Sequence, residues 1–334
     1  MVNEDRFEMK NRYYIFITLL TLMCMSSCQK EELYTGPCDV RVRLMAQEEV
    51  NVTRAYKPIS SATPAFEAEL FVTNGTLANS TTMTWDGSTT TTNLKLEEGD
   101  YYMYGYLPKR DGATFDKDTR VMSIPQIAGL GTTDIMVLRK GTVLSIRKDD
   151  KNVEATLLMD HQMAKVTPRF YIDSEYAKIR SIRIKKVEFS MDGASSYTAQ
   201  VEYDNSTSPI SYTLAWTPEA TGQNLTALAY ENESPTENLQ VGKTNALACG
   251  ECYVCPAQPI AGLNMTVTYD VYDTKGQLVR PDDEATNKMK IKVSGITLAK
   301  LEAGKNYILN IRIVPTYLYV LSDNDEESVL TIND

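Results

Sequence analysis

An alternation of apolar and polar residues with a period of two is the feature that most constrains the fold of this sequence. It recurs in short stretches, clearest at residues 40–44, 66–72 and 182–189, and these are bounded by Gly, Asn, Asp or Pro. Such a period places apolar side chains on one face of a β-strand, and helical periodicity is nearly absent. Strands with one apolar face are typical of antiparallel sheets. The sequence therefore predicts an all-β protein built from antiparallel β-sandwiches.

Length and charge narrow the classes of function. A chain of 334 residues is long enough for two domains. Its formal net charge of −10 argues against nucleic acid as a partner, because nucleic-acid binders present a basic face. His161 is the single histidine, which excludes a metal site with several histidines and disfavours a Ser-His-Asp enzyme. No phosphate-binding loop or nucleophile elbow is evident, so we expect a protein that is not an enzyme and holds no metal or cofactor.

The N-terminus has the pattern of a lipoprotein signal peptide. Residues 13–25 are apolar but too few to span a bilayer as a helix, and Lys10 and Arg12 precede them. Ser27 stands directly before Cys28, as in the bacterial lipobox, where cleavage leaves the Cys as a diacylated N-terminus. An ordinary cleavage site beside a structural Cys is the alternative. We expect residues 1–27 to be removed, lipid on Cys28, and a linker over residues 28–38.

Two β-sandwich domains are expected, at residues 39–157 and 158–334. An internal similarity supports them. At residues 96–101 and again at 301–307, a Gly-containing turn leads into a Tyr-rich strand, which ends at Pro108 or Pro315. Proline ends such strands because it cannot donate to a strand ladder. One shared pattern is weak support for duplication, but two related domains would show it.

Four cysteines remain after the signal peptide and Cys28 are set aside: Cys38, Cys249, Cys252 and Cys255. The last three lack the fourth Cys of an iron–sulfur run, and a zinc site would need Cys38 from far away in the chain. On one strand, Cys249 and Cys255 would share a face and Cys252 would point the other way, which suits a common metal poorly. Disulfides or buried thiols are favoured over a metal, and four cysteines allow three pairings.

Polar runs are interpreted as solvated surface. Residues 74–93 are rich in Thr, Ser and Asn, and we expect an outward-facing loop segment there. The acidic runs at 282–284 and 323–327 lack the ligand spacing of a calcium loop. His161, next to Asp160 at an expected strand start, is expected to be a structural hydrogen-bonding residue.

Several motifs, taken in their order along the chain, resemble one known family. They are the lipobox at Cys28 and the segments 161–166, 253–259 and 301–307. Together they are similar to the fimbrillin family of Bacteroidetes, the subunits of type V pili, over most of the mature chain. The resemblance implies two transthyretin-like β-sandwich domains in tandem and an outer-membrane lipoprotein exposed on the cell surface. It also implies assembly into a fimbria with other pilus subunits.

The resemblance further implies a route of assembly by proteolysis and strand exchange. In fimbrillin-like stalk subunits a protease cuts after an Arg in the loop that follows the first strand, and a neighbour's strand fills the groove left by that strand. Here residues 40–44 would be the removable strand, and the cut would fall between Arg54 and Ala55. A solvated loop Arg is the alternative.

The donor strand, by the same resemblance, would be the C-terminal tail, which carries Val329, Leu330 and Ile332 behind an acidic run. A closing strand of the C-terminal domain is the alternative. Cys38 departs from the Cys-poor stalk subunits and resembles anchor subunits, which often have a Cys a short way after the lipid Cys.

Host surface ligands are a further expected class of partner for such a fimbrial subunit. A different class of function is a surface lipoprotein that binds glycan on a β-sandwich and feeds its uptake. It would need exposed aromatic rings on one face. Trp85 and Trp216 are the only tryptophans, which is thin support.

Overall fold

The computed structural model describes residues 36–47, 56–59, 63–76, 78–139, 142–206, 211–289, 291–293 and 296–313. These residues form strands and turns almost throughout, and the predicted all-β fold class is confirmed. Their helical elements are α2 (Ser174–Ala177) and the 3-10 helix η1 (Lys243–Asn245). No helix in these ranges has the length and apolarity needed to cross a membrane.

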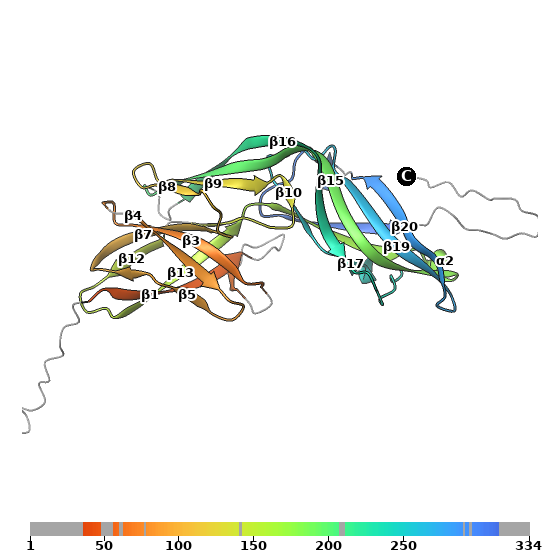
Figure 1. Cartoon of the computed structure of the whole chain (residues 1–334), viewed down its shortest axis with the longest axis horizontal. Coiled ribbons are helices and arrows are strands. Elements are labelled where there is room, and N and C mark those ends of the chain that lie inside the picture. Colours follow the sequence, from red (N-terminus) through yellow and green to blue (C-terminus); the bar gives the residue numbers. More distant parts are fainter. Residues whose placement is uncertain are drawn as a thin grey trace, which may run out of the picture.

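The first half of the chain builds a ten-stranded sheet, here called the N-terminal sheet (Figure 1). Its strand order is β2 (Tyr56–Pro58), β1 (Cys38–Gln47), β13 (Asn152–His161), β11 (Met136–Leu138), β7 (Gly99–Leu107), β3 (Phe66–Thr73), β4 (Ala78–Trp85) and β5 (Thr90–Thr92). In addition, β12 (Thr142–Ile146) pairs with β7, and β6 (Lys95–Leu96) pairs with β1. Within this sheet β1 and β13 run parallel, and the other pairs are antiparallel.

Two further sheets form the other half of the molecule. The hairpin sheet has the order β20 (Leu278–Lys288), β19 (Asn264–Asp273), β15 (Arg180–Asp204), β9 (Val121–Ala128) and β8 (Thr114–Asp116), with β16 (Ser211–Glu231) on β15. The short sheet has the order β10 (Leu130–Gly131), β18 (Cys252–Val254), β14 (Ala164–Ile172) and β17 (Leu247–Ala248), with β23 (Asn306–Ile313) on β14. A separate pair joins β21 (Lys292–Val293) and β22 (Ile296–Thr297).

The strands follow the alternation of the sequence. The predicted strands at 40–44, 66–72 and 182–189 lie within β1, β3 and β15. The expectation of a loop over residues 74–93 is wrong, because this stretch contains β4 and β5. Threonine is β-branched and fits a pleated surface, so a Thr-rich run forms strands once apolar residues such as Met83 are buried beneath it.

Three apolar cores hold the sheets together. The first lies under the N-terminal sheet and includes Leu70, Met103 and Leu157. The second is shared by the short sheet and the hairpin sheet. The third packs the opposite face of β7, with Tyr104, against β9 and the end of β15, with Tyr203. Figure 1 shows the β15–β16 hairpin extending over the N-terminal sheet, so β7 is covered on both faces.

The strands before and after residue 158 are interleaved. β9 pairs with β15 and β10 pairs with β18, although residues 121–131 precede the expected boundary. Each half nevertheless joins its own first and last strands in parallel, β1 with β13 and β14 with β23. The division into domains at 39–157 and 158–334 therefore stays a proposal, with the third core as the interface between them.

The repeated turn-and-strand pattern does not mark equivalent positions. β7 pairs antiparallel with β3, β11 and β12 in the interior of its sheet. β23 pairs in parallel with β14 and has no second ladder partner among the described residues. Both segments begin with a Gly-containing turn and end at a proline, but their strands occupy different positions in their sheets. The repeated pattern is therefore no sign of duplication.

A row of aromatic rings fixes the third core. The ring centroids of Phe115 and Tyr104 lie 4.9 Å apart, those of Tyr104 and Tyr203 4.7 Å, and those of Tyr203 and Tyr212 5.8 Å. The Tyr203 hydroxyl donates to the carbonyl of Leu138 on β11 at 2.9 Å. The long hairpin is thus tied to the N-terminal sheet by ring packing and a buried hydrogen bond. Burial raises the pKa of both Tyr104 and Tyr203.

We expect buried tyrosines to set the alkaline limit of stability. Their folded pKa values lie above the unfolded value of about 10, and burial raises the pKa of Tyr176 to about 12. The unfolded chain therefore loses these protons first. The free energy of unfolding should be level below about pH 10 and fall as the pH rises towards about 12. Tyrosinate absorbance and circular dichroism, measured together, check this. Ionisation of all tyrosines near pH 10 with the β signal intact would contradict it.

Candidate functional site

Strand β1 is the best candidate for a functional element because its two flanks are paired so differently. Along one flank it runs parallel to β13 without interruption, from Asp39 opposite Asn152 to Ala46 opposite Met159. Its buried and exposed residues alternate, and the buried ones enter the first core: Cys38, Val40, Val42 and Leu44. Parallel ladders have evenly spaced bonds, so β1 is held evenly along this side.

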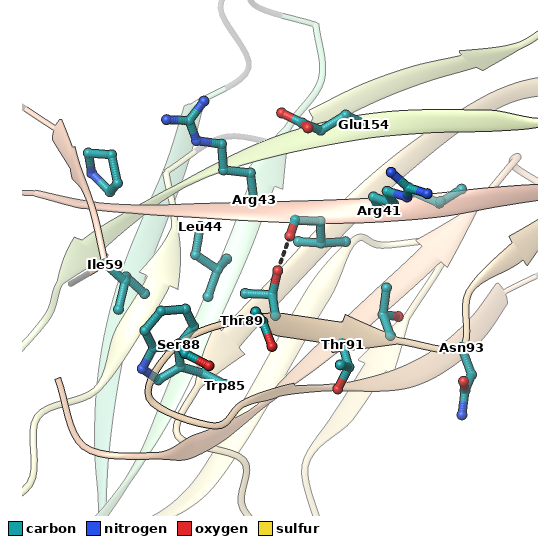
Figure 2. A pocket seen from close by; sticks show the side chains of 15 residues that line it. Arg41, Arg43, Leu44, Ile59, Trp85, Ser88, Thr89, Thr91, Asn93 and Glu154 are labelled. Carbon is teal, nitrogen blue, oxygen red and sulfur yellow. Dashed lines mark hydrogen bonds between the residues drawn. The ribbon is translucent and has the colours of Figure 1, made fainter. Parts of the chain in front are cut away.

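The other flank of β1 is paired incompletely. The Val40 N–H donates to the Leu94 carbonyl at 3.0 Å, and the Leu44 carbonyl accepts from the Ile59 N–H at 3.5 Å. β6 pairs with Cys38 and Asp39, and β2 pairs with residues 45–47. Between them no described strand forms a ladder with β1. The Thr90 hydroxyl donates to the Val42 carbonyl at 2.5 Å, as Figure 2 shows, in place of a backbone partner. β5 pairs with β4 at the far end of the sheet, and β6, which follows it in the chain, pairs with β1. Residues 90–96 therefore bring the far end of the sheet back beside β1, and an incompletely paired seam remains between β1 and these residues.

A cavity of about 720 Å³ occupies this seam, here called the β1 slot. One wall is the backbone of β1, and the facing wall comes from residues 88–93. Trp85 and Ile59 lie at one end in Figure 2, and the Trp85 indole donates to the Thr63 carbonyl at 3.2 Å. The Thr92 hydroxyl, also in the lining, is buried with no hydrogen-bond partner among the described residues. Unpaired polar groups beside an open strand flank favour a site that accepts further backbone.

Removal of β1 would open a long apolar groove. Burial of one Val or Leu side chain stabilises a fold by about 1.5–3 kcal/mol, and β1 inserts several such side chains. The same contacts would be available to any strand of matching pattern laid beside β13. The strand is therefore strongly held through its buried side chains.

The C-terminal end of β1 is fastened by His161 at the end of β13. The Nε2 atom of His161 lies 3.0 Å from the Gln47 carbonyl, and its Nδ1 contacts the Asp134 carboxylate. Both neighbours are acceptors, so both bonds form when the ring carries two protons. Burial raises the pKa of Asp134. His161 is thus a structural hydrogen-bonding residue as expected, but it ends a strand, and its acidic partner is Asp134 because Asp160 points to the opposite face.

A second polar cluster fastens the start of β2. The Tyr56 hydroxyl donates to Asp160 and accepts from Arg139, whose guanidinium lies 5.3 Å from the Tyr56 ring centre. Tyr212 of β16 donates to the same carboxylate at 3.4 Å. Gln47 and Tyr56 are consequently both anchored. The predicted cleavage site at Arg54 and Ala55 falls between them, outside the described residues.

Other predicted sites also lie outside the described residues. These are the signal peptide with Ser27, the lipidation site Cys28, and the predicted donor strand with Val329, Leu330 and Ile332. They stay predictions.

The four cysteines are buried thiols, and none is joined to another. Cys38 begins β1, Cys249 and Cys252 lie in the second core, and Cys255 lies in the third. The expectation that Cys249 and Cys255 share a face is wrong. Gly250, at φ 72°, interrupts the strand between β17 and β18, so the period of two does not run through. Burial raises the pKa of Cys249 and Cys255 to about 12. Among the described residues no group of three His, Cys, Asp or Glu is placed to hold a metal.

Sequence reasoning missed the polar partners at the end of β1 and at the start of β2, and it missed the wall of the slot. Tyr56, Arg139 and Asp134 are far apart in the chain and carry no local motif. The Thr-rich run that forms the slot wall was a visible signal, but its composition also fits a loop. Of the two tryptophans, Trp85 is buried in the slot, and Trp216 packs edge-on against Tyr197 at 6.4 Å.

Comparison with known proteins finds no family model and no curated protein that matches the sequence. Solved structures do match. A cell adhesion protein of Bacteroides uniformis is 16% identical, with 82% of this chain and 93% of that chain covered and a TM-score of 0.42. A fimbrial protein of Bacteroides vulgatus is 10% identical, with 83% and 95% covered and a TM-score of 0.45. The fimbrial anchor protein Mfa2 of Porphyromonas gingivalis is 11% identical, with 88% and 96% covered and a TM-score of 0.30.

Truncation of a buried β1 side chain should destabilise the fold much more than truncation of its exposed neighbour. We expect Leu44→Ala to lower the free energy of unfolding by about 2–5 kcal/mol, and Arg43→Ala to change it by less than about 0.5 kcal/mol. Urea unfolding of both variants measures this. Equal shifts in the two midpoints would mean that β1 is not anchored in the first core.

The number of free thiols in the mature chain can be measured directly. Alkylation of the unfolded mature chain without reductant should label Cys38, Cys249, Cys252 and Cys255, as read by peptide mass. The folded chain should resist labelling, because the thiols are buried and their reactive thiolate form is disfavoured. Recovery of any two of these cysteines in one disulfide-linked peptide pair would show that the alternative of a disulfide holds.

Proposed function

We propose that this chain is a non-enzymatic subunit of a cell-surface fimbria, assembled by exchange of strand β1. The observation that carries the proposal is the pairing of β1. It has a complete parallel ladder on one flank, an open slot on the other, and apolar side chains that an equivalent strand can replace. Such a strand is a natural site for β-augmentation, in which main-chain bonds supply affinity and alternate side chains supply fit.

Export and anchoring complete the proposal. The apolar segment before Ser27 would direct secretion, and lipid on Cys28 would hold the precursor in the outer membrane. Gly36 is the first described residue, and β1 begins at Cys38. Few residues therefore separate the lipid from the strand, and release of β1 would release the body of the protein from its anchor.

Cleavage after Arg54 would make that release feasible. Gln47 and Tyr56 are held by separate polar clusters on either side of the proposed cut. After the cut, β1 would leave without β2, which would stay hydrogen-bonded to Asp160 and Arg139. Proteolysis would thus convert an intramolecular strand into an exchangeable one and leave the rest of the seam in place.

The donor strand would come from residues 327–334 of a neighbouring subunit. Leu330 and Ile332 alternate and can enter two of the positions vacated by the buried side chains of β1, while Val329 would face outward. The acidic residues before them would remain in solvent. A donor that fills part of the groove still restores the ladder with β13.

The alternative within the same class is a lipid-anchored fimbrial anchor subunit, which keeps its first strand. Cys38 favours it as a feature of the sequence, and the burial of Cys38 in the first core is compatible with either role. The two roles differ in the mature N-terminus. A polymerising subunit yields a form that starts at Ala55, whereas an anchor retains acylated Cys28.

Cleavage at Arg54 should switch the protein from monomer to polymer. We expect the mature chain, treated with an Arg-specific protease, to start at Ala55 and to form SDS-resistant ladders on gels. Arg54→Ala should abolish both, whereas Arg147→Ala, at an exposed turn, should leave them unchanged. Deletion of 327–334 should abolish the ladders but not the cut. Cut protein that stays monomeric would exclude the role of a polymerising subunit.

A further inference from the structure

A second cavity lies away from the β1 slot, where several turns meet at one end of the N-terminal sheet. It has a volume of about 430 Å³. Its walls come from the β3–β4 turn, the β8–β9 turn, residues 205–206 directly after β15, and the face of β7 that carries Tyr102 and Tyr104. Loops gathered at one end of a β-sandwich are a usual place for binding sites, because a rigid scaffold holds variable side chains.

The floor of this cavity is aromatic. Tyr102 and Tyr104 lie on the same face of β7, two residues apart, and both line the cavity. Tyr104 is fully buried in the ring row of the third core, which fixes the floor. Tyr102 is only half-buried, so its ring keeps accessible surface for an apolar face of a ligand. Neither ring needs to move to make room.

The rim of the cavity carries polar groups with unused hydrogen-bonding capacity. Asn205 donates through Nδ2 to the Tyr104 hydroxyl at 2.7 Å, and its Oδ1 is buried with no partner among the described residues. Arg120 has no hydrogen bond or ion pair from its guanidinium to another described residue, while its carbonyl accepts from Tyr203 N at 3.2 Å and fixes the turn. A ligand hydroxyl at Asn205 Oδ1 would remove the cost of an unpaired buried acceptor, about 1–3 kcal/mol.

The charges at the rim balance. Lys117 is paired with Asp118 at 2.5 Å. Hydrogen bonds from Ser206 lower the pKa of the Asp204 carboxyl, and the charge of Arg120 lowers it further. Two cations and two anions leave no net charge to attract an ionic ligand. Planar amide, guanidinium and carboxylate groups around an aromatic floor suit a ligand that offers both hydroxyl groups and an apolar C–H face.

We propose that this cavity binds a neutral hexose unit of a glycan, with its C–H face on Tyr102 and its hydroxyls at Asn205 and Arg120. The volume admits one or two sugar units. The proposal deepens the surface role proposed above, since it assigns a ligand class to a subunit exposed on the cell. It shares no residue with the β1 slot, so binding and assembly can be tested separately.

The test uses the uncut mature chain with Cys28→Ser, so that it carries no lipid. Methyl α-mannoside, methyl β-galactoside and N-acetylglucosamine are titrated and followed by saturation-transfer NMR, with glucuronate and sialic acid as acidic counterparts. We expect saturable millimolar binding of at least one neutral sugar. Arg120→Asn and Tyr102→Leu should each weaken it about tenfold, the loss expected for one charge-assisted contact or one ring platform.

Matched controls separate binding from folding. Arg120 directly precedes β9, and Gln126 lies within it. Both residues have a positive φ, 58° and 57°, which Asn tolerates. Gln126 lies outside the cavity. Tyr101 lies on the face of β7 opposite to Tyr102. Gln126→Asn and Tyr101→Leu should therefore leave sugar binding unchanged.

Three outcomes would overturn the proposal: no saturable binding of a neutral sugar, binding of the acidic sugars alone, or equal affinity in Arg120→Asn, Tyr102→Leu and their controls. Ladder formation by the Arg-cut chain would still proceed in each of these cases. A chain that binds sugar but never polymerises would instead refute the strand-exchange role alone.

Discussion

A β-strand has hydrogen-bonding groups on two flanks, and the first strand of this protein satisfies only one of them fully. The ladder between β1 and β13 secures the strand, and the seam beside it leaves Val42 with a threonine hydroxyl in place of a neighbouring backbone. The closure of the N-terminal sheet, the fastening of Gln47 and Tyr56, and the wall built by residues 88–93 all surround this incomplete pairing. The strand is bound tightly through its side chains and loosely through one side of its backbone.

The two halves of the chain depend on one another through the long β15–β16 hairpin. Tyr203 and Tyr212, near its far end, complete a row of rings that begins on strands of the first half, and Asp160 of β13 accepts from Tyr212. The same hairpin end supplies Asn205 to the second cavity. One element therefore links the third core, the polar cluster at the start of β2 and the proposed sugar site.

Local pattern was enough for the strands whose apolar and polar residues alternate, and contacts between distant residues were not accessible from the sequence. Alternation in residues 40–44 predicts both the strand and its buried face, because a period of two is a local property. The seam depends on where residues 90–96 return, which no local pattern specifies. The Thr-rich stretch was assigned to a loop because composition alone cannot separate an exposed strand from a turn. The prediction that Cys249 and Cys255 share a face was wrong because the strand is interrupted at Gly250. Only glycine fits there, since a Cβ would lie 1.8 Å from the Ala229 carbonyl oxygen.

The parallel pairing of the first and last strands in each half has a mechanical consequence. A pull on the two ends of the described chain acts along β1 and β23, and each lies parallel to its neighbour over eight paired residues. Under such a load the ladder bonds are sheared together, whereas an antiparallel hairpin pulled from its open end is peeled one bond at a time. The architecture thus resists tension along its length, a property of use to any protein held on a cell surface in moving fluid.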